Sequence, residues 1–305
     1  MRTALINKLT KLAEKDKRIW LLTADLGFSV FENFRKKFPD RFVNCGVAEQ
    51  NMMGVAAGLA LSGKKPYVYS IIPFITMRCM EQIKNDIAYQ KLDVKIIGAG
   101  GGFSYGPLGA THHAIEDLGI LRVIPNLTVL SPGDPIETEQ LIAKSYLTKN
   151  PTYIRLTNSK DIIHKRSDKI EIGKPFVLKR GEYGVLIVNG IFLKIGMILD
   201  EKLRKMGYNF KLISLPTLKP VDKDALFKEV KNQKMVITLE EHNAIGGLNS
   251  LLSEILMERG WKGKLRKVAV PDEYFSKVGN AEYIREKYHF NPDQLIDFIL
   301  KTHEI

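Results

Sequence analysis

The sequence predicts an α/β protein built from two doubly wound domains. Short β-type runs alternate with helical segments along the whole chain, and a polar stretch without periodicity, Asn158–Lys174, interrupts this alternation. Alternating strands and helices favour parallel sheets with crossover helices, and 305 residues exceed the usual size of one domain. We therefore expect one domain at residues 1–160 and a second at residues 175–305, joined by the polar stretch.

The first half contains five expected strands and four expected helices. Its β-type runs are Ile19–Thr23, Tyr67–Ile71, Val94–Gly98, Thr128–Leu130 and Tyr153–Leu156. Its helical segments are the amphipathic N-terminus Met1–Leu9, then Glu49–Leu61, Thr76–Tyr89 and Pro135–Lys149.

The second half repeats this alternation. Strands are expected near Gly184–Val188, Phe210–Ser214, Val236–Leu239 and Leu265–Val270, and helices near Phe192–Met206 and Gly246–Arg259. The sequence shows no internal repeat or low-complexity segment.

Composition narrows the possible partners and compartments. The net charge is +12, but the 46 Lys and Arg residues are scattered, so anionic substrates or an acidic partner chain are favoured over nucleic acid. Two cysteines, Cys45 and Cys79, form neither a disulfide framework nor a zinc motif. The N-terminus has no signal-peptide pattern, and no apolar stretch is long enough to span a bilayer. We expect a cytoplasmic protein without a membrane partner.

The most distinctive run is Gly46–Ala60, where Glu49 is the only carboxylate at the start of a helix of small and apolar residues. Such a helix is expected to bury Glu49 in part. Burial disfavours the charged form of a carboxyl group, so Glu49 could be protonated and donate a hydrogen bond. The alternative is that Glu49 only favours the positive end of the helix dipole.

A glycine-rich segment, Gly98–His113, follows a predicted strand. Ligand-binding loops of α/β sheets lie at this position, and glycines allow the backbone to approach a ligand closely. A flexible surface turn is the alternative. Histidine titrates near neutrality, so His112 or His113 could donate to, or exchange protons with, a substrate oxygen.

These motifs resemble the transketolase family of thiamine-diphosphate enzymes, which includes the deoxyxylulose-phosphate synthases. The resemblance rests on GVAEQNMMGVAAGLALSG at residues 46–63 and on a G-x-T-H motif ending at His112. It implies that Glu49 is catalytic and contacts the pyrimidine ring nitrogen of thiamine diphosphate. It implies that His112 is catalytic and binds substrate, whereas His113 falls where the family often has glutamine.

Other cofactor contacts follow from the same resemblance. Phe74 matches the aromatic residue that stacks on the aminopyrimidine, with Ile71 and Met77 flanking it; a core phenylalanine is the alternative. Asp25 matches an aspartate that faces the thiazolium ring, although a lone aspartate at a strand end could equally cap a helix.

The substrate contacts of the family are only half retained. Arg2 and Ser29 match sugar-phosphate contacts, whereas a histidine expected near Gly100 and an arginine expected near Asn158 are missing. Leu108 replaces an aspartate that reads a sugar hydroxyl. A leucine buried there would leave a hydroxyl unpaired, so we expect an atypical sugar substrate.

The resemblance covers the pyrimidine-binding and C-terminal domains of a transketolase. Its second part rests on Leu215–Asp222 and Glu240–Leu248; we expect Glu241 and His242 to form hydrogen bonds at an interface. The family holds Mg²⁺ and the diphosphate with a GDG motif, which occurs nowhere in this sequence. No metal ligands are therefore expected in this chain.

We expect the C-terminal subunit of a split transketolase, which moves a two-carbon ketol unit from a ketose to an aldose. Thiamine diphosphate would bind between this chain and a separate N-terminal subunit carrying GDG and the Mg²⁺ ligands, in an α2β2 heterotetramer. One alternative is the β subunit of a 2-oxoacid dehydrogenase E1, which the AEQN string and the G-x-T-H motif disfavour. Another is a non-catalytic transketolase-like subunit. A deoxyxylulose-phosphate synthase is normally one long chain and is less favoured.

Overall fold

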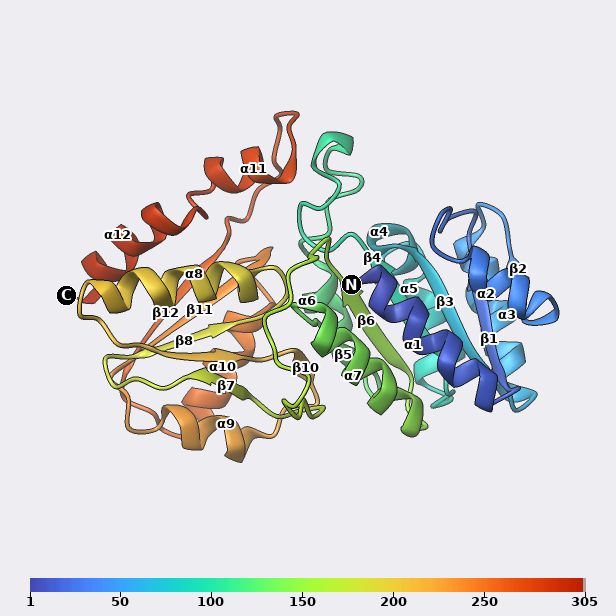
Figure 1. Cartoon of the computed structure of the whole chain (residues 1–305), viewed down its shortest axis with the longest axis horizontal. Coiled ribbons are helices and arrows are strands. Elements are labelled where there is room, and N and C mark those ends of the chain that lie inside the picture. The colour runs from blue at the N-terminus through green and yellow to red at the C-terminus, as the bar shows by residue number, and fades with distance from the viewer. Residues whose placement is uncertain (304–305) are drawn as a thin grey trace.

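The computed structural model describes residues 1–303 and contains two sheets that lie side by side, each covered by helices (Figure 1). The predicted α/β class with two doubly wound domains is confirmed. The first sheet has seven strands, all parallel except the edge strand β10. Their spatial order is β10 (Thr217–Lys219), β5 (Thr128–Leu130), β6 (Thr152–Leu156), β4 (Lys95–Ala99), β3 (Lys65–Ile71), β1 (Ile19–Thr23) and β2 (Phe42–Asn44).

Helices cover both faces of this sheet because its strands are apolar on both sides. Along β1, Leu21 packs with α1 (Arg2–Lys15) and α7 (Pro135–Leu147), whereas Leu22 packs with α3 (Glu49–Leu61) on the opposite face. The remaining helical segments of the first half are α2 (Glu32–Lys37), η1 (Pro39–Arg41), α4 (Ile72–Ile75), α5 (Met80–Gln82), η2 (Ile83–Ala88), η3 (Gly106–Leu108) and α6 (Asp117–Arg122).

The second sheet has five strands, and only its edge strand β7 is antiparallel. Their order is β12 (Lys264–Val270), β11 (Met235–Asn243), β8 (Val185–Val188), β9 (Lys211–Ser214) and β7 (Phe176–Lys179). The helices of this half are α8 (Phe192–Lys205), α9 (Lys223–Val230), α10 (Leu248–Glu258), α11 (Ala281–Lys287) and α12 (Pro292–His303).

The structure differs from the sequence-based expectation at several places. The predicted helix Thr76–Tyr89 is broken into α5 and the π-helical turn η2, in which the amide of Tyr89 bonds to the carbonyl of Lys84, five residues back. Strand β10 follows the polar stretch in sequence but pairs with β5 of the first sheet. The polar stretch itself has no helix or strand, yet Ser159, His164 and Ile170 within it are buried.

Among residues 1–303, no helix combines the length and the apolar composition that a membrane crossing requires. The largest described apolar clusters lie around the two sheets. The carboxyl ends of the central strands β3 and β4 point to one edge of the first sheet, where ligand sites of α/β sheets are found.

Candidate functional site

Glu49 is the first residue of α3 and is 2% exposed. The small and apolar residues of the helix bury it, as the sequence predicted. Its carboxylate accepts two hydrogen bonds, from the hydroxyl of Ser70 at 3.3 Å and from Nη1 of Arg78 at 2.7 Å. In this structure the carboxylate of Glu49 is thus an acceptor, and the hypothesis that it donates a hydrogen bond to a ligand stays a prediction.

Arg78 is the site residue that sequence reasoning missed. Its side chain is 44% exposed, and its guanidinium carbon lies 4.4 Å from the ring centroid of Phe74. One guanidinium therefore contacts both the buried carboxylate and the face of an aromatic ring. The available signal was a single basic residue directly after the mostly apolar segment Ile71–Met77.

Phe74 lies in the short helix α4 directly after β3, and His112 lies in the glycine-rich segment that follows the neighbouring strand β4. Their ring centroids are 5.0 Å apart in an edge-to-face arrangement, and the ring of Tyr105 lies 6.3 Å from His112. His112 Nδ1 shares a hydrogen bond of 3.0 Å with the hydroxyl of Thr111. Arg78 contacts both Glu49 and Phe74, and Phe74 contacts His112. The structure thus brings Glu49, Phe74 and His112 into one cluster.

The three remaining cofactor candidates lie around this edge with different exposure. Ile71, at the end of β3, is buried, whereas Met77 is exposed. Asp25 follows β1 in a left-handed conformation with φ 51°, and its carboxylate accepts a hydrogen bond of 3.1 Å from the Asn44 amide. Asp25 is exposed, so its carboxylate remains accessible.

Arg2 and Ser29, the two remaining substrate candidates, lie in different surroundings. Arg2 lines a small hollow of about 40 Å³ together with Gly100, Tyr105 and Asn158. Ser29 is exposed, has φ 61°, and its amide bonds to the side chain of Glu32. The hollow therefore joins Arg2 to the two positions where phosphate-reading side chains were expected and are missing.

The conformation at Gly100 explains one missing side chain. Its φ is +90°, and a Cβ atom there would lie 2.1 Å from the ring of Tyr105. No histidine fits at this position while the loop keeps its shape. The expectation that Leu108 is buried is wrong. This leucine lies in the turn η3 and is 53% exposed.

Comparison with known families decides the classification. Residues 1–160 match the family description "Transketolase, pyrimidine binding domain", and residues 173–295 match "Transketolase, C-terminal domain". The chain belongs to the transketolase family. Enzymes of this family depend on thiamine diphosphate.

Similar proteins include subunits of transketolases encoded in separate pieces. The chain is 36% identical to an apulose-4-phosphate transketolase subunit of Actinobacillus succinogenes over 88% of this chain and 86% of that one. It is 33% identical to a 6-deoxy-6-sulfo-D-fructose transketolase subunit of Clostridium sp. strain MSTE9 over 97% and 92%. A solved structure called "Split gene transketolase, inactive beta4 tetramer" superposes with a TM-score of 0.90 at 34% identity, over 98% of this chain and 97% of that one.

The transketolase C-terminal domain makes direct contacts with the glycine-rich segment and with α6, which follows it. The carboxylate of Glu241 accepts a hydrogen bond of 3.1 Å from the amide of Phe103, and Nε2 of His242 accepts one of 3.1 Å from the amide of Gly119. The prediction that Glu241 and His242 bond across an interface is confirmed. His113 is buried and bonds to the carbonyl of Gly106, so it packs inside the loop and not toward Phe74.

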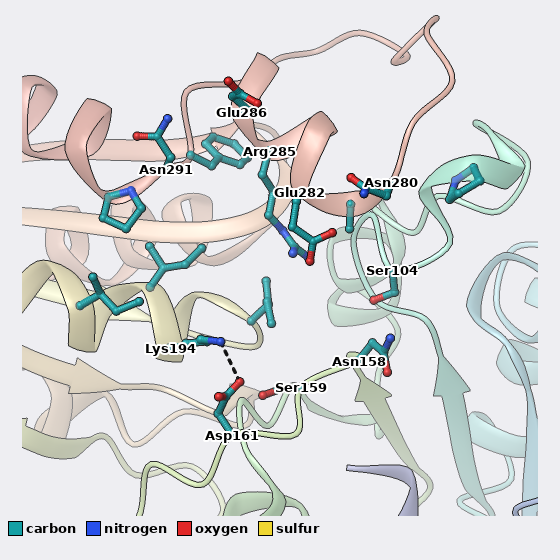
Figure 2. Close-up of a pocket in the computed structure, with 17 residues that line it drawn as sticks. Ser104, Asn158, Ser159, Asp161, Lys194, Asn280, Glu282, Arg285, Glu286 and Asn291 are labelled. Carbon is teal, nitrogen blue, oxygen red and sulfur yellow. Dashed lines mark ion pairs between the residues drawn. The ribbon is translucent and has the colours of Figure 1, made fainter.

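A cavity of about 560 Å³ opens between the two halves of the chain, within the size range of ligand pockets (Figure 2). Ser104 and Asn158 line both this cavity and the small hollow beside Arg2. Of the other lining residues, Lys194 of α8 forms an ion pair of 3.1 Å with Asp161 of the polar stretch. The cavity therefore adjoins the candidate substrate position.

One further group of buried ligand-type side chains lies outside this region. Asp134, Glu137 and His164 are close enough to hold an ion. The oxygens of Asp134 accept amide hydrogen bonds from Glu137, Ile163 and His164, and those of Glu137 accept from Gly133, Ser214 and His164. These bonds satisfy the carboxylates, so the cluster joins the polar stretch to both halves of the chain.

Proposed function

We propose that this chain is the C-terminal subunit of a split transketolase. It would transfer a two-carbon ketol unit from a ketose to an aldose, with thiamine diphosphate bound between it and a separate subunit. The observation that carries the proposal is the cluster of Glu49 at the start of α3, Phe74 in α4 and His112 in the glycine-rich segment after β4. We retain residues 1–160 and 175–305 as the proposed domains of this subunit.

The contacts of Arg78 support a site for a flat nitrogen-containing ring. Its planar cation lies on the ring of Phe74 while it donates to Glu49. A protonated aminopyrimidine offers the same combination of a flat face and an N–H donor. The residues present therefore fit the pyrimidine end of thiamine diphosphate, provided that Arg78 moves away when the ring enters.

Each proposed residue has a defined task. Glu49 would hold a proton at the pyrimidine ring nitrogen, and Phe74 would orient the ring, with Ile71 and Met77 at its edges. The bound cofactor supplies an electron sink for cleavage of the carbon–carbon bond. His112 would donate to, or take a proton from, a substrate oxygen.

The remaining candidates would act at the edges of this site. The carboxylate of Asp25 would face the cationic part of the cofactor. Arg2 and Ser29 would bind the phosphate end of the substrate.

Mg²⁺ and the diphosphate would be held by the partner, an N-terminal transketolase subunit with a GDG motif, in an α2β2 assembly. The outer face of α3 supports a partner surface. Val55 and Leu61 are exposed there, and Gly54 and Gly58 have open space beside them. An apolar face on the helix that begins with Glu49 is suited to a covering subunit.

The substrate is proposed to differ from the pentose phosphates of central metabolism. Among the described residues, Arg2 is the only basic one that lines the small hollow, and neither Gly100 nor Asn158 adds a cation. A missing hydrogen bond to a charged group costs about 1.5–3 kcal/mol, or roughly ten- to a hundredfold in specificity. For xylulose 5-phosphate with ribose 5-phosphate we expect kcat/KM below about 10⁴ M⁻¹s⁻¹; a higher value would identify an ordinary pentose-phosphate transketolase.

The test of the split-enzyme proposal is calorimetry with thiamine diphosphate and Mg²⁺. The chain alone is compared with its complex with the proposed GDG-containing subunit. We expect weak binding by the chain alone, tight binding by the complex, and ketol transfer only by the complex. Micromolar, Mg²⁺-dependent binding by the chain alone would contradict the proposal. A complex that binds the cofactor but transfers no ketol group would indicate a non-catalytic subunit.

A further inference from the structure

The glycine-rich segment that carries His112 is attached to the C-terminal half of the chain by the ring of Phe103. This ring is fully buried and belongs to the apolar cluster formed by the second sheet and its helices. It stacks on Tyr288 at 5.6 Å between centroids with an interplanar angle of 15°, and it meets His113 edge-on at 5.2 Å. One end of the segment is thus packed inside the neighbouring domain.

The backbone of the segment also lies against the carboxylate of Glu241. The amide of Phe103 donates to Glu241 Oε2 at 3.1 Å in a buried environment. At the preceding residue, Gly102, φ is +64°, and a Cβ atom would lie 1.8 Å from the same oxygen. Only glycine permits this approach, so the position of the loop depends on the position of the carboxylate.

Glu241 is itself held firmly. It is 1% exposed, and Arg285 donates from Nε to one carboxylate oxygen and from Nη2 to the other at 3.1 Å. Two parallel N–H bonds fix the orientation as well as the charge of a carboxylate. The backbone carbonyl of Glu241 accepts a further bond of 3.0 Å from Arg155, which also donates to the carbonyl of Ala114.

A third contact lies at the tip of the loop. In Figure 1 the turn η3 rises beside α11, and at Gly106 a Cβ atom would lie 2.6 Å from the carbonyl oxygen of Gly279. Figure 2 shows Arg285 extending from α11 into the cavity that Ser104 of the same loop also lines. The loop is therefore in contact with the C-terminal half at its base, at Phe103 and at its tip.

We infer that Glu241, oriented by Arg285, is a positioning residue for the glycine-rich loop and so for His112. The inference rests on the proposed function of His112. From Phe103 the loop continues through η3 to His112, which meets Phe74 edge-on at 5.0 Å. Because an edge-to-face contact between rings is weak, the approach of His112 to the cluster depends on where the loop is held. The C-terminal half contributes no residue to the cluster of Glu49, Phe74 and His112, yet it would then determine the position of His112 in the reaction.

The test compares the full chain with Glu241→Gln, which keeps the shape but loses the charge that Arg285 requires. Arg285→Lys is the second variant, since it keeps the positive charge but cannot bond both oxygens at once. Glu286→Gln is the matched control, because it removes a carboxylate next to Arg285 that lies exposed on the same helix. Circular dichroism and thermal melting establish that each variant is folded.

Two measurements on the isolated chain report loop position without any activity. Hydrogen–deuterium exchange follows residues 98–113. NMR of isotope-labelled histidine follows the signal of His112, which is assigned by its absence in His112→Gln. The chemical shift of this signal depends on the ring current of Phe74. We expect faster exchange and a displaced His112 signal in Glu241→Gln and in Arg285→Lys, and neither change in the control.

Kinetics of the complex with the partner subunit complete the test. A misplaced catalytic group lowers kcat, here by about ten- to a hundredfold, with a smaller change in KM. Unchanged exchange and an unchanged His112 signal in both variants would overturn the inference, as would a displaced loop with an unaltered kcat. A wild-type complex without ketol transfer would overturn the proposed function instead, and the exchange and NMR data would still decide whether Glu241 holds the loop.

Discussion

Glu49 and Glu241 are both buried carboxylates paired with an arginine, yet the two pairs have different access to solvent. Arg78, the partner of Glu49, has a side chain that is 44% exposed, whereas that of Arg285, the partner of Glu241, is 16% exposed. Arg285 bonds both oxygens of Glu241, and Phe103 adds a backbone amide. Glu49 has one bond to Arg78 and a long one to Ser70.

The comparison shows that burial of a carboxylate does not reveal its role. What differs is whether its partner can leave. Arg78 can move into solvent and give its place to a ligand, because the other face of its side chain is open. Arg285, at the wall of the cavity, is mostly buried and bonds both oxygens of Glu241, so this pair is held more firmly. We call Glu49–Arg78 the open pair and Glu241–Arg285 the enclosed pair. The open pair is suited to a reaction site, and the enclosed pair is suited to supporting a loop.

The largest expected effect concerns the open pair. Glu49→Gln should lower turnover of the reconstituted complex by more than about a hundredfold, because an amide keeps the shape but cannot transfer a proton. The midpoint of urea unfolding should change little. A loss below about tenfold, or roughly 1.4 kcal/mol of barrier, would mean that Glu49 has only a structural role and that the contrast with Glu241 fails.

The enclosed pair should have the largest effect on stability. Arg285→Gln leaves the Glu241 carboxylate buried without its counter-charge, and loss of one partner from a buried pair costs about 3–5 kcal/mol. Urea unfolding of the isolated chain measures this change. A cost below about 1 kcal/mol would show that water reaches Glu241 and that the pair is not enclosed.

A third buried acid, Glu137, has a titratable partner. Burial lowers the pKa of His164, but the hydrogen bond and charge of Glu137, with Asp134 and Asp168 nearby, raise it overall above its ordinary value of 6.5. The stability from this pair is therefore full below about pH 6.5 and is lost as pH rises through the raised pKa. Neither arginine pair should show this dependence.

His164→Gln provides the corresponding measurement. The variant should lose about 1.5–3 kcal/mol of unfolding free energy near pH 6, as expected for a hydrogen bond to a charged group, and progressively less at higher pH. Unfolding curves of wild type and variant between pH 6 and pH 9 report the difference. A difference that is constant with pH would mean that His164 stays neutral.

The smallest expected effect is that of Arg78→Gln on stability, about 1 kcal/mol or less, because a half-exposed guanidinium can be replaced by water. The variant should also free the face of Phe74. A stability loss as large as that of Arg285→Gln would place Arg78 among the enclosed structural arginines. The two unfolding experiments are best done side by side in the same buffer.

Local patterns were sufficient for most elements of the fold. The predicted bounds of Glu49–Leu61, Ile19–Thr23 and Thr128–Leu130 agree with α3, β1 and β5. These segments consist mainly of small, β-branched or apolar residues. Such patterns are a local property of the sequence and can be recognised without the fold. The helix expected at Thr76–Tyr89 is broken, and its π-helical turn packs against α3, a contact that the local pattern does not contain.

Pairing between distant segments was not available from the sequence. Strand β10 joins the first sheet across the polar stretch, and Arg78 reaches Glu49 from 29 residues away. Nothing in the residues around either partner encodes such a contact. The exposure of Leu108 was missed for the same reason, since its environment is set by the turn η3 and not by its neighbours in sequence.

The sequence alone determined the α/β class, the family resemblance and the candidates Glu49, Phe74 and His112, because short motifs and periodicity carry that information. Only the tertiary structure decided how these residues are held: Arg78 on Glu49, Tyr105 in the space beside Gly100, and Glu241 under the loop of His112. The physical reason is that side-chain partners and backbone approaches form between segments that the fold, and not the local sequence, brings together.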